Sequence, residues 1–215
     1  MITIYVGGFG SGKTEISLNT ALAKAADKPV LADLDMVNPY FCSREMEQLL
    51  TDNGVTFIGP RSDLKLSDVP HVPASIIGFL RSERPMIIDV GGDEVGCWVL
   101  GYLSKYIKLR DHAMYLVLNP YRPFSDTIER VTNLRMALEK ASRLQFSAVV
   151  SNPNFSAATD IASVLEGHEI NKSFAEALGL PIAFLTVDDR LIPEAQGLIQ
   201  EKVMPVKILL RPDWI

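Results

Sequence analysis

Short runs of consecutive apolar residues alternate along the chain with longer segments in which apolar residues recur every three or four positions. The short runs predict β-strands buried on both faces, because such strands have no solvent side to alternate with. They lie at residues 2–6, 29–34, 55–58, 85–90, 113–118, 146–150 and 182–187. The longer segments predict helices at residues 14–26, 43–50, 74–81, 95–109, 125–142 and 159–178.

This alternation predicts an α/β fold with a mostly parallel sheet and helices on both of its faces. Residues 64–73 contain two prolines and are expected to be irregular. The stretch VMPVKILLRPDWI, from residue 203 onward, is apolar and β-like, which predicts either an edge strand or a packed extension. The length of 215 residues suits one domain over residues 1–215. Ligands of such sheets bind at the carboxyl ends of the strands, and each polar motif below follows a predicted strand.

Composition narrows the classes of partner. Hydrophobic residues make up 47% and charged residues 22%, and the formal net charge is -5. An acidic chain lacks the global positive field that holds nucleic acid or anionic lipid. No apolar run approaches the length of about 18 residues needed to span a bilayer, and no basic segment precedes the first apolar run as in a signal peptide. The two cysteines, Cys42 and Cys97, are expected to be reduced thiols of a cytoplasmic protein.

The first polar motif matches the pattern G-x-x-x-x-G-K-S/T. It comprises Gly7, Gly8, Phe9, Gly10, Ser11, Gly12, Lys13 and Thr14, and Glu15 follows it at the start of the predicted helix. Glycines let such a loop curl so that backbone N–H groups point at phosphate oxygens, and the helix adds its N-terminal dipole. Lys13 is expected to reach the β- and γ-phosphates, and the Thr14 hydroxyl to bind Mg²⁺. The alternative is a glycine-rich turn that only caps the helix.

A second motif, MIIDVGG, ends the predicted strand at residues 85–90. Asp89 is expected to bind Mg²⁺ through water. Gly92, in a D-x-x-G arrangement, is expected to donate its backbone N–H to the γ-phosphate. Without the phosphate-binding loop upstream, an apolar strand that ends in Asp would be common in any α/β protein.

Two further motifs follow other strands. In LADLDMVNPYF, the alternating Asp33 and Asp35 predict that one faces the phosphates and the other a structural partner. We choose Asp35 to position the attacking water or Mg²⁺; the alternative is an Asp that caps the next helix. In VVSNPNF, Asn152 is expected to face a purine edge, unless it is only a turn residue before a proline. Guanine readers usually place a carboxylate three residues later, and Phe155 at that position favours adenine.

The four motifs, in this order and spacing, resemble the ParA/MinD-type branch of the SIMIBI class of P-loop NTPases, the CobQ/CobB/MinD/ParA nucleotide-binding proteins. The resemblance covers residue 2 to about residue 187 and implies a three-layer α/β/α fold. It also implies that ATP and Mg²⁺ are bound in a nucleotide-dependent homodimer, with slow hydrolysis acting as a switch for a partner or cargo that the sequence does not identify. By this resemblance Lys13, Asp35 and Asp89 act in hydrolysis. Thr14, Asp35 and Asp89 hold the metal, and Asn152 contacts adenine.

The sequence departs from this family at Gly8. The family loop, K-G-G-x-G-K-T, carries a signature lysine five residues before Lys13, and that lysine acts on the partner's phosphates as an arginine finger does. Arg44, Arg61 and Arg122 are candidates to replace it, and Arg122 is favoured because it directly follows a predicted strand. Two other activities stay open on the same fold. One is that of a small-molecule kinase or ATP-dependent ligase, and the other is that of a nucleotide-binding module without hydrolysis.

Overall fold

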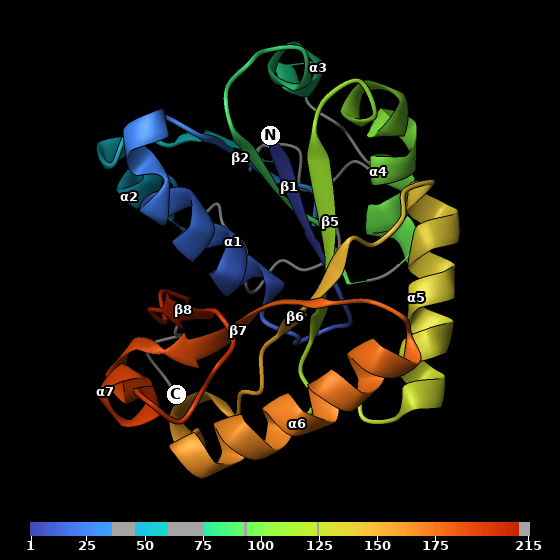
Figure 1. The fold of residues 1–215 in the computed structure, drawn as a ribbon. Coiled ribbons are helices and arrows are strands. Elements are labelled where there is room, and N and C mark those ends of the chain that lie inside the picture. The colour runs from blue at the N-terminus through green and yellow to red at the C-terminus, as the bar shows by residue number, and fades with distance from the viewer. Residues whose placement is uncertain (36–45, 60–74, 93, 124, 211–215) are drawn as a thin grey trace, which may run out of the picture.

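The computed structural model describes residues 1–35, 46–59, 75–92, 94–123 and 125–210. The strands among these residues form one eight-stranded sheet (Figure 1). In chain order the strands are β1 (Ile2–Val6), β2 (Val30–Asp33), β3 (Thr56–Ile58), β4 (Met86–Asp89), β5 (His112–Leu118), β6 (Ala148–Ser151), β7 (Ile182–Asp188) and β8 (Val203–Val206). In space they follow the order β3-β2-β4-β1-β5-β6-β7-β8, and every neighbouring pair is parallel. The predicted parallel α/β sheet is confirmed.

Helices cover both faces of this sheet (Figure 1). On one face lie α1 (Lys13–Ala23) and α2 (Glu47–Asp52), and on the other α3 (Ser75–Leu80), α4 (Glu94–Ile107), α5 (Ile128–Ser142) and α6 (Ile161–Ala177). Short elements complete the fold: α7 (Ile192–Ala195) and the 3-10 turns η1 (Ala25–Asp27), η4 (Ser156–Ala158) and η5 (Asp189–Leu191). Strand β1 shows how the layers are built, because Ile2 and Ile4 contact one helical layer and Tyr5 the other. Both sides of the central strands are therefore apolar.

Local capping explains why two helices begin later than their apolar pattern predicts. The Thr127 side chain accepts a hydrogen bond from Arg130 N, which starts α5 at residue 128 rather than 125. Asp160 and Ser163 form a reciprocal capping box, which starts α6 at residue 161 rather than 159. The sequence pattern locates the apolar face of a helix, whereas the side chain that satisfies its first N–H groups decides where it begins.

The C-terminal segment combines both predicted alternatives. Strand β8 joins the edge of the sheet, and residues 207–210, here called the strap, then run along α1. Asn19 exchanges two hydrogen bonds of 2.9 Å with the backbone of Lys207. The Glu15 carboxylate accepts hydrogen bonds from the backbone N–H groups of Leu209 (3.1 Å) and Leu210 (2.7 Å). Burial raises the pKa of the Glu15 carboxyl, and these backbone hydrogen bonds oppose the shift.

Close packing of α4 on α5 supplies a stability prediction. Gly101 lies where the two helices meet, and a Cβ added there would lie 2.4 Å from the Ala141 carbonyl oxygen. Helix propensity alone would make Gly101→Ala stabilising by up to about 1 kcal/mol. Because the clashing atom is backbone, we expect the clash to dominate and the free energy of unfolding to fall by about 1–3 kcal/mol. Urea denaturation measures it.

The matched control is Gly78→Ala in α3. Gly78 is exposed, and a Cβ added there would meet nothing within 4 Å. Only the propensity gain of about 0.5–1 kcal/mol is then left, so this variant should be neutral or slightly more stable. Equal changes in the two variants would contradict the packing argument.

Candidate functional site

The loop between β1 and α1 has the backbone shape that an anion cradle requires. Gly10 and Gly12 adopt positive φ angles of 71° and 89°, in the left-handed region that glycine adopts without strain. Consecutive N–H groups in such a conformation form a concave anion-binding surface. Gly12 is also the N-cap of α1, so the helix begins where the loop ends and adds its positive end to the cradle.

Asn152, at the end of β6, anchors this loop. Its Nδ2 donates a 2.7 Å hydrogen bond to the Ser11 carbonyl oxygen, and its Oδ1 accepts from the Thr186 hydroxyl. A Cβ on Gly12 would lie only 2.1 Å from Asn152 Nδ2, so the asparagine fits because position 12 is glycine. The structure thus gives Asn152 a positioning role that the sequence did not indicate. Its contact with adenine stays a prediction.

Lys13 lies buried at the first position of α1. Its side chain bends back over the loop, and Nζ donates a 3.2 Å hydrogen bond to the Gly8 carbonyl oxygen. The same cation acts on Asp89, whose pKa its charge lowers. The structure therefore holds the predicted phosphate lysine between the cradle and the end of β4.

The aspartates of two motifs meet at the carboxyl edge of the sheet. Asp33 and Asp89 end the neighbouring strands β2 and β4 in register, and both are buried. Asp33 Oδ1 accepts a 2.9 Å hydrogen bond from the backbone N–H of Asp35, the next residue but one. One aspartate of the alternating pair thus has the structural role that the sequence suggested, and it orients the backbone of the other. Residues 36–45, with the rest of the LADLDMVNPYF motif and Arg44, lie outside the described residues, as does Arg61.

Asp89 has the electrostatic environment of a metal-binding carboxylate. Burial raises the pKa of Asp89 to about 6; the charge of Lys13 and the nearby Thr14 hydroxyl oppose the shift, and the charge of Asp35 adds to it. Ser17 donates a weak 3.4 Å hydrogen bond to Oδ1, while Oδ2 is buried without a hydrogen-bond partner in the described part of the chain. An oxygen with an unused acceptor position, beside a hydroxyl and a second carboxylate, fits the preference of Mg²⁺ for hard oxygen ligands.

The described residues contain no group of three or more His, Cys, Asp and Glu side chains arranged to hold a metal by themselves. This is compatible with Mg²⁺, which usually binds through one or two carboxylates and takes further ligands from water and substrate phosphates. The donor set here thus suits a metal that arrives with its nucleotide.

The D-x-x-G segment lies directly against the cradle. A Cβ on Gly92 would lie 2.9 Å from Phe9 N and 3.1 Å from the Gly7 carbonyl oxygen, so the two backbones are in contact. On the other side of the loop, the Arg122 side chain lies beside Gly10, with its Cδ 3.6 Å from the place of a Cβ there. Of the three candidate replacements for the signature lysine, the structure describes Arg122 and places its side chain next to the loop.

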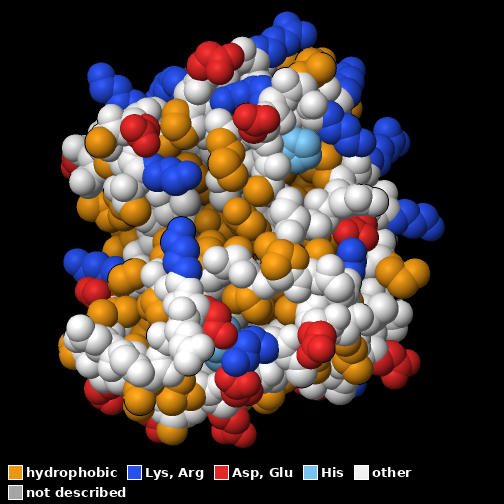
Figure 2. All heavy atoms as spheres, viewed as in Figure 1, with side chains coloured by type: hydrophobic (Ala, Val, Ile, Leu, Met, Phe, Trp, Pro, Cys, Tyr) orange, Lys and Arg blue, Asp and Glu red, His pale blue; other side chains and the backbone are white. Residues whose placement is uncertain are grey.

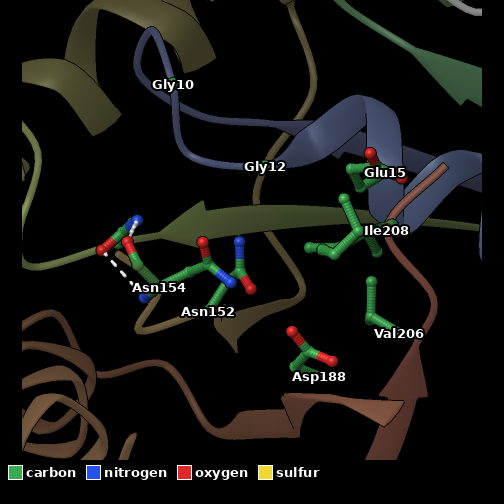
Figure 3. Close-up of a pocket in the computed structure, with 10 residues that line it drawn as sticks. Gly10, Gly12, Glu15, Asn152, Asn154, Asp188, Val206 and Ile208 are labelled. Carbon is green, nitrogen blue, oxygen red and sulfur yellow. Dashed lines mark hydrogen bonds between the residues drawn. The ribbon is translucent and has the colours of Figure 1, made fainter. Parts of the chain in front are cut away.

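A pocket lies beside the β1–α1 loop, between α1 and the edge of the sheet formed by β7 and β8 (Figure 3). Its lining consists of Gly10, Gly12, Glu15, Ile16, Asn119, Asn152, Asn154, Asp188, Val206 and Ile208. Sequence reasoning did not assign five of these to the site: Ile16, Asn119, Asp188, Val206 and Ile208. Asn119 directly follows a strand and Asp188 ends one, which is the signal that could have identified them. The three aliphatic residues carry no such signal, and the place of Val206 and Ile208 depends on how the last strand pairs.

The face of the molecule in Figure 2 carries charged side chains of both signs. Figure 2 shows Lys and Arg side chains interspersed with Asp and Glu on one face of the molecule, with hydrophobic side chains between them. No described helix is both long and apolar enough to cross a bilayer.

A parallel sheet whose first strand leads through a glycine-rich loop into a helix, with an aspartate at the end of the adjacent strand, is the three-layer α/β/α fold of P-loop NTPases. Solved structures of FtsY and of the 54 kDa protein of the signal recognition particle match this chain, which therefore shares their fold. No protein-family model matches the sequence, and no curated protein does.

Among the matching structures are cell division protein FtsY from Thermotoga maritima (TM-score 0.56, 20% identity) and FtsY from Mycoplasma mycoides (0.58, 17%). A third is the 54 kDa protein of the signal recognition particle from Aeropyrum pernix, in complex with GDP (0.53, 18%). The matches cover 86–87% of this chain; they cover only 61% and 59% of the two FtsY chains and 40% of the third. At such identities the likeness shows the fold alone.

Proposed function

We propose that this protein binds ATP with Mg²⁺ and hydrolyses it slowly, as a nucleotide-dependent switch for a protein partner or cargo. The observation that carries the proposal is the convergence of the cradle, Lys13, Asp89 and Gly92 at one edge of the sheet. The bound GDP of one matching structure supports a purine nucleotide on this fold. The ParA/MinD-type branch is part of the same proposal and rests on the sequence motifs.

Each group has a defined task in this proposal. The backbone N–H groups of residues 7–15 surround the phosphates, and Lys13 neutralises the β- and γ-phosphates. Thr14, Asp35 and Asp89 hold Mg²⁺, which when bound offsets the charge of the phosphate oxygens. Asp35 orients a water for attack on the γ-phosphorus, and the bond to the β-phosphate oxygen breaks. The backbone N–H of Gly92 senses whether a γ-phosphate is present.

Adenine is proposed over guanine because of what occupies the position of the usual guanine-reading carboxylate. Phe155 stands there, and its ring stacks on Tyr121 with centroids 3.9 Å apart. The two rings stack on each other, and position 155 offers no carboxylate that could accept a hydrogen bond from a guanine N–H. Affinity for ATP and GTP, measured by calorimetry with Mg²⁺, tests this assignment directly.

A dimer formed only with the triphosphate is the expected behaviour of the switch. We expect size exclusion with light scattering to give a dimer with Mg²⁺ and a slowly hydrolysed ATP analogue, and a monomer with ADP. A monomer under both conditions would overturn the proposed switch. Binding without phosphate release would indicate a nucleotide-binding module, and phosphate on a metabolite would indicate a kinase.

Arg122 is proposed to provide the charge that Gly8 cannot. Removing a cation that stabilises the transition state should slow turnover, and for Arg122→Ala we expect a loss of about tenfold or more with ATP affinity changed much less. The matched control is Arg130→Ala on α5, where the arginine is exposed and pairs with Asp126 at 2.7 Å. Equal turnover in the two variants would remove Arg122 from the mechanism.

A further inference from the structure

We propose that the carboxylate of Asp188 selects the nucleotide by accepting a hydrogen bond from the exocyclic amino group of a purine base. This inference rests on the proposed function, because it assumes that the phosphates occupy the cradle and the base the adjoining pocket. Asp188 ends β7 and lines that pocket, where Figure 3 shows its side chain pointing into the space below Asn152. Its side chain is 10% exposed, so what enters the pocket meets a largely desolvated carboxylate.

Two asparagine side chains of the pocket, Asn152 and Asn119, form hydrogen bonds within the protein. Asn152 binds the Ser11 carbonyl and the Thr186 hydroxyl through its two ends. Asn119 donates to the carbonyl oxygen of Asn154 at 2.8 Å and accepts from the backbone N–H of Tyr121 at 3.2 Å. The Asn119 oxygen accepts two hydrogen bonds, because the backbone N–H of Asn154 also donates to it at 3.4 Å, whereas the Asn152 oxygen accepts one and carries no charge.

The remaining acceptors of the lining differ in what they still offer. Glu15 Oε1 accepts from the backbone N–H groups of Leu209 and Leu210 in the strap, and Oε2 shares the Leu209 N–H at 3.1 Å. The Asn154 side-chain oxygen accepts from Ser156 N at 2.7 Å. Asp188 receives one hydrogen bond on each oxygen, both from Arg190: backbone N to Oδ1 at 3.1 Å and Nε to Oδ2 at 3.0 Å. A carboxylate oxygen can accept two, so Asp188 keeps one acceptor position on each of its oxygens, whereas Glu15 keeps one on Oε2 alone.

Arg190 also holds this carboxylate in place. Its guanidinium contacts Asp188 and, through NH2, the carbonyl oxygens of Ala157 (3.3 Å) and Thr159. The pair thereby links the end of β7 to η4 and fixes the direction of the acceptor. A carboxylate that is held in one orientation distinguishes bases better than a mobile one. To turn away from a base that has no donor, it would have to break these hydrogen bonds.

The apolar part of the pocket adjoins the carboxylate. Ile16, Val206 and Ile208 contribute aliphatic surface of the kind that packs on the flat face of a base. Val206 is the register partner of Asp188 across the β7–β8 pair, so the wall and the acceptor are neighbours on adjacent strands. A base that packs on this wall brings its edge to Asp188.

The chemistry predicts which bases are accepted. A carboxylate only accepts hydrogen bonds, so it attracts an amino group and repels a carbonyl oxygen. ATP and GTP carry exocyclic amino groups at different positions, and ITP carries none. We expect ATP to bind at least about tenfold more tightly than ITP, as is usual when a site built for a donor meets an analogue that lacks it.

The decisive experiment is calorimetry of the full chain with Mg²⁺ and each of ATP, GTP and ITP, for the wild type and Asp188→Asn. The amide can donate as well as accept, so we expect the variant to bind ITP more tightly and ATP less, and the ratio to fall to within about threefold of one. Asp189→Asn is the matched control. It makes the same chemical change at the adjacent exposed residue, which is outside the pocket lining, and should keep the wild-type ratio.

The outcomes separate this inference from the proposed function. If the wild type binds none of the three triphosphates, the proposed function fails and this inference with it. If it binds ATP and ITP equally, or if Asp188→Asn keeps the wild-type ratio, the inference alone fails. A preference for GTP that Asp188→Asn removes would support the carboxylate as reader and overturn the adenine assignment. A wild-type comparison of ATP with the unsubstituted purine ribonucleoside triphosphate needs no variant, and equal affinity there would also overturn the inference.

Discussion

Replacing Lys13 with alanine is expected to weaken Mg-ATP binding by about 100-fold or more, since losing one partner of a buried charge contact typically costs about 2–5 kcal/mol. Lys13 is buried and its Nζ lies over the cradle, 3.2 Å from the Gly8 carbonyl oxygen. Without it, the phosphate charge would face the carboxylates of Asp35 and Asp89, which the structure brings to the same edge of the sheet. Isothermal titration calorimetry with Mg-ATP measures the change.

Lys140→Ala is the control for this prediction. It removes the same charge from an exposed position on α5, in the helical layer opposite α1, and should leave the affinity unchanged. The folded state of both variants is checked by their thermal unfolding. An unchanged affinity in Lys13→Ala would show that the cradle is not the phosphate site.

Replacing Asp89 with asparagine is expected to have opposite effects on stability and activity. The folded-state pKa of Asp89 is about 6, above the ordinary value of 3.8, because burial disfavours its charged form. A raised pKa means that the folded state binds the proton more tightly than the unfolded state does. Its contribution to stability is therefore complete below about pH 4 and is lost as the pH rises through 6. Above about pH 6 the ionised carboxylate destabilises the protein that has no nucleotide or metal bound.

The asparagine of this variant has no charge to bury, so Asp89→Asn should be more stable than the wild type at about pH 8. The shift sets an upper limit of about 3 kcal/mol for the gain, and we expect about 1–3 kcal/mol. Urea denaturation at about pH 4 and about pH 8 measures it, and the difference between variant and wild type should grow over that interval. Asp27→Asn, at an exposed residue of η1, should show no such growth. A difference that does not depend on pH would contradict the burial argument.

The rate of ATP hydrolysis by Asp89→Asn should fall, in contrast to its stability. The amide is a weaker ligand for Mg²⁺ than a carboxylate, so Asp89→Asn should lose about 100-fold or more of its phosphate release. Addition of Mg-ATP should stabilise the wild type clearly and the variant much less, because ligand binding to the folded state alone raises stability. A variant that is stabilised as strongly as the wild type would remove Asp89 from the metal site.

Burial of a carboxylate that destabilises the empty fold is typical of a site selected for function. A buried ionised side chain at such a site lowers the stability of the folded protein as long as no ligand is bound. Perturbed pKa values therefore cluster at functional sites. In this chain the perturbed group is one that sequence reasoning had already chosen from the MIIDVGG motif.

The sequence by itself determined the parts of the protein that local chain chemistry controls. Apolar runs specify strands that are buried on both faces, and all seven predicted strands are present with ends shifted by at most two residues. The loop at residues 7–14 could be identified because a phosphate cradle is built from consecutive N–H groups and the helix that follows them. Asp89 and Gly92 could be placed relative to that loop because the carboxyl ends of parallel strands share one edge.

Only the tertiary structure decided which residues surround the pocket beside the loop. Asn152 binds Ser11 across 141 residues and Glu15 binds Leu210 across 195, and no local pattern encodes such pairs. An apolar run indicates that a strand is buried, but not which strand lies beside it or in which register. Asp188 and Val206 line one pocket because β8 pairs with β7 in a particular register, and that pairing is set by packing over the whole sheet. The loop end of the candidate site could therefore be predicted from the sequence, whereas Asn152 was the one residue of the strand ends around the pocket that the sequence indicated.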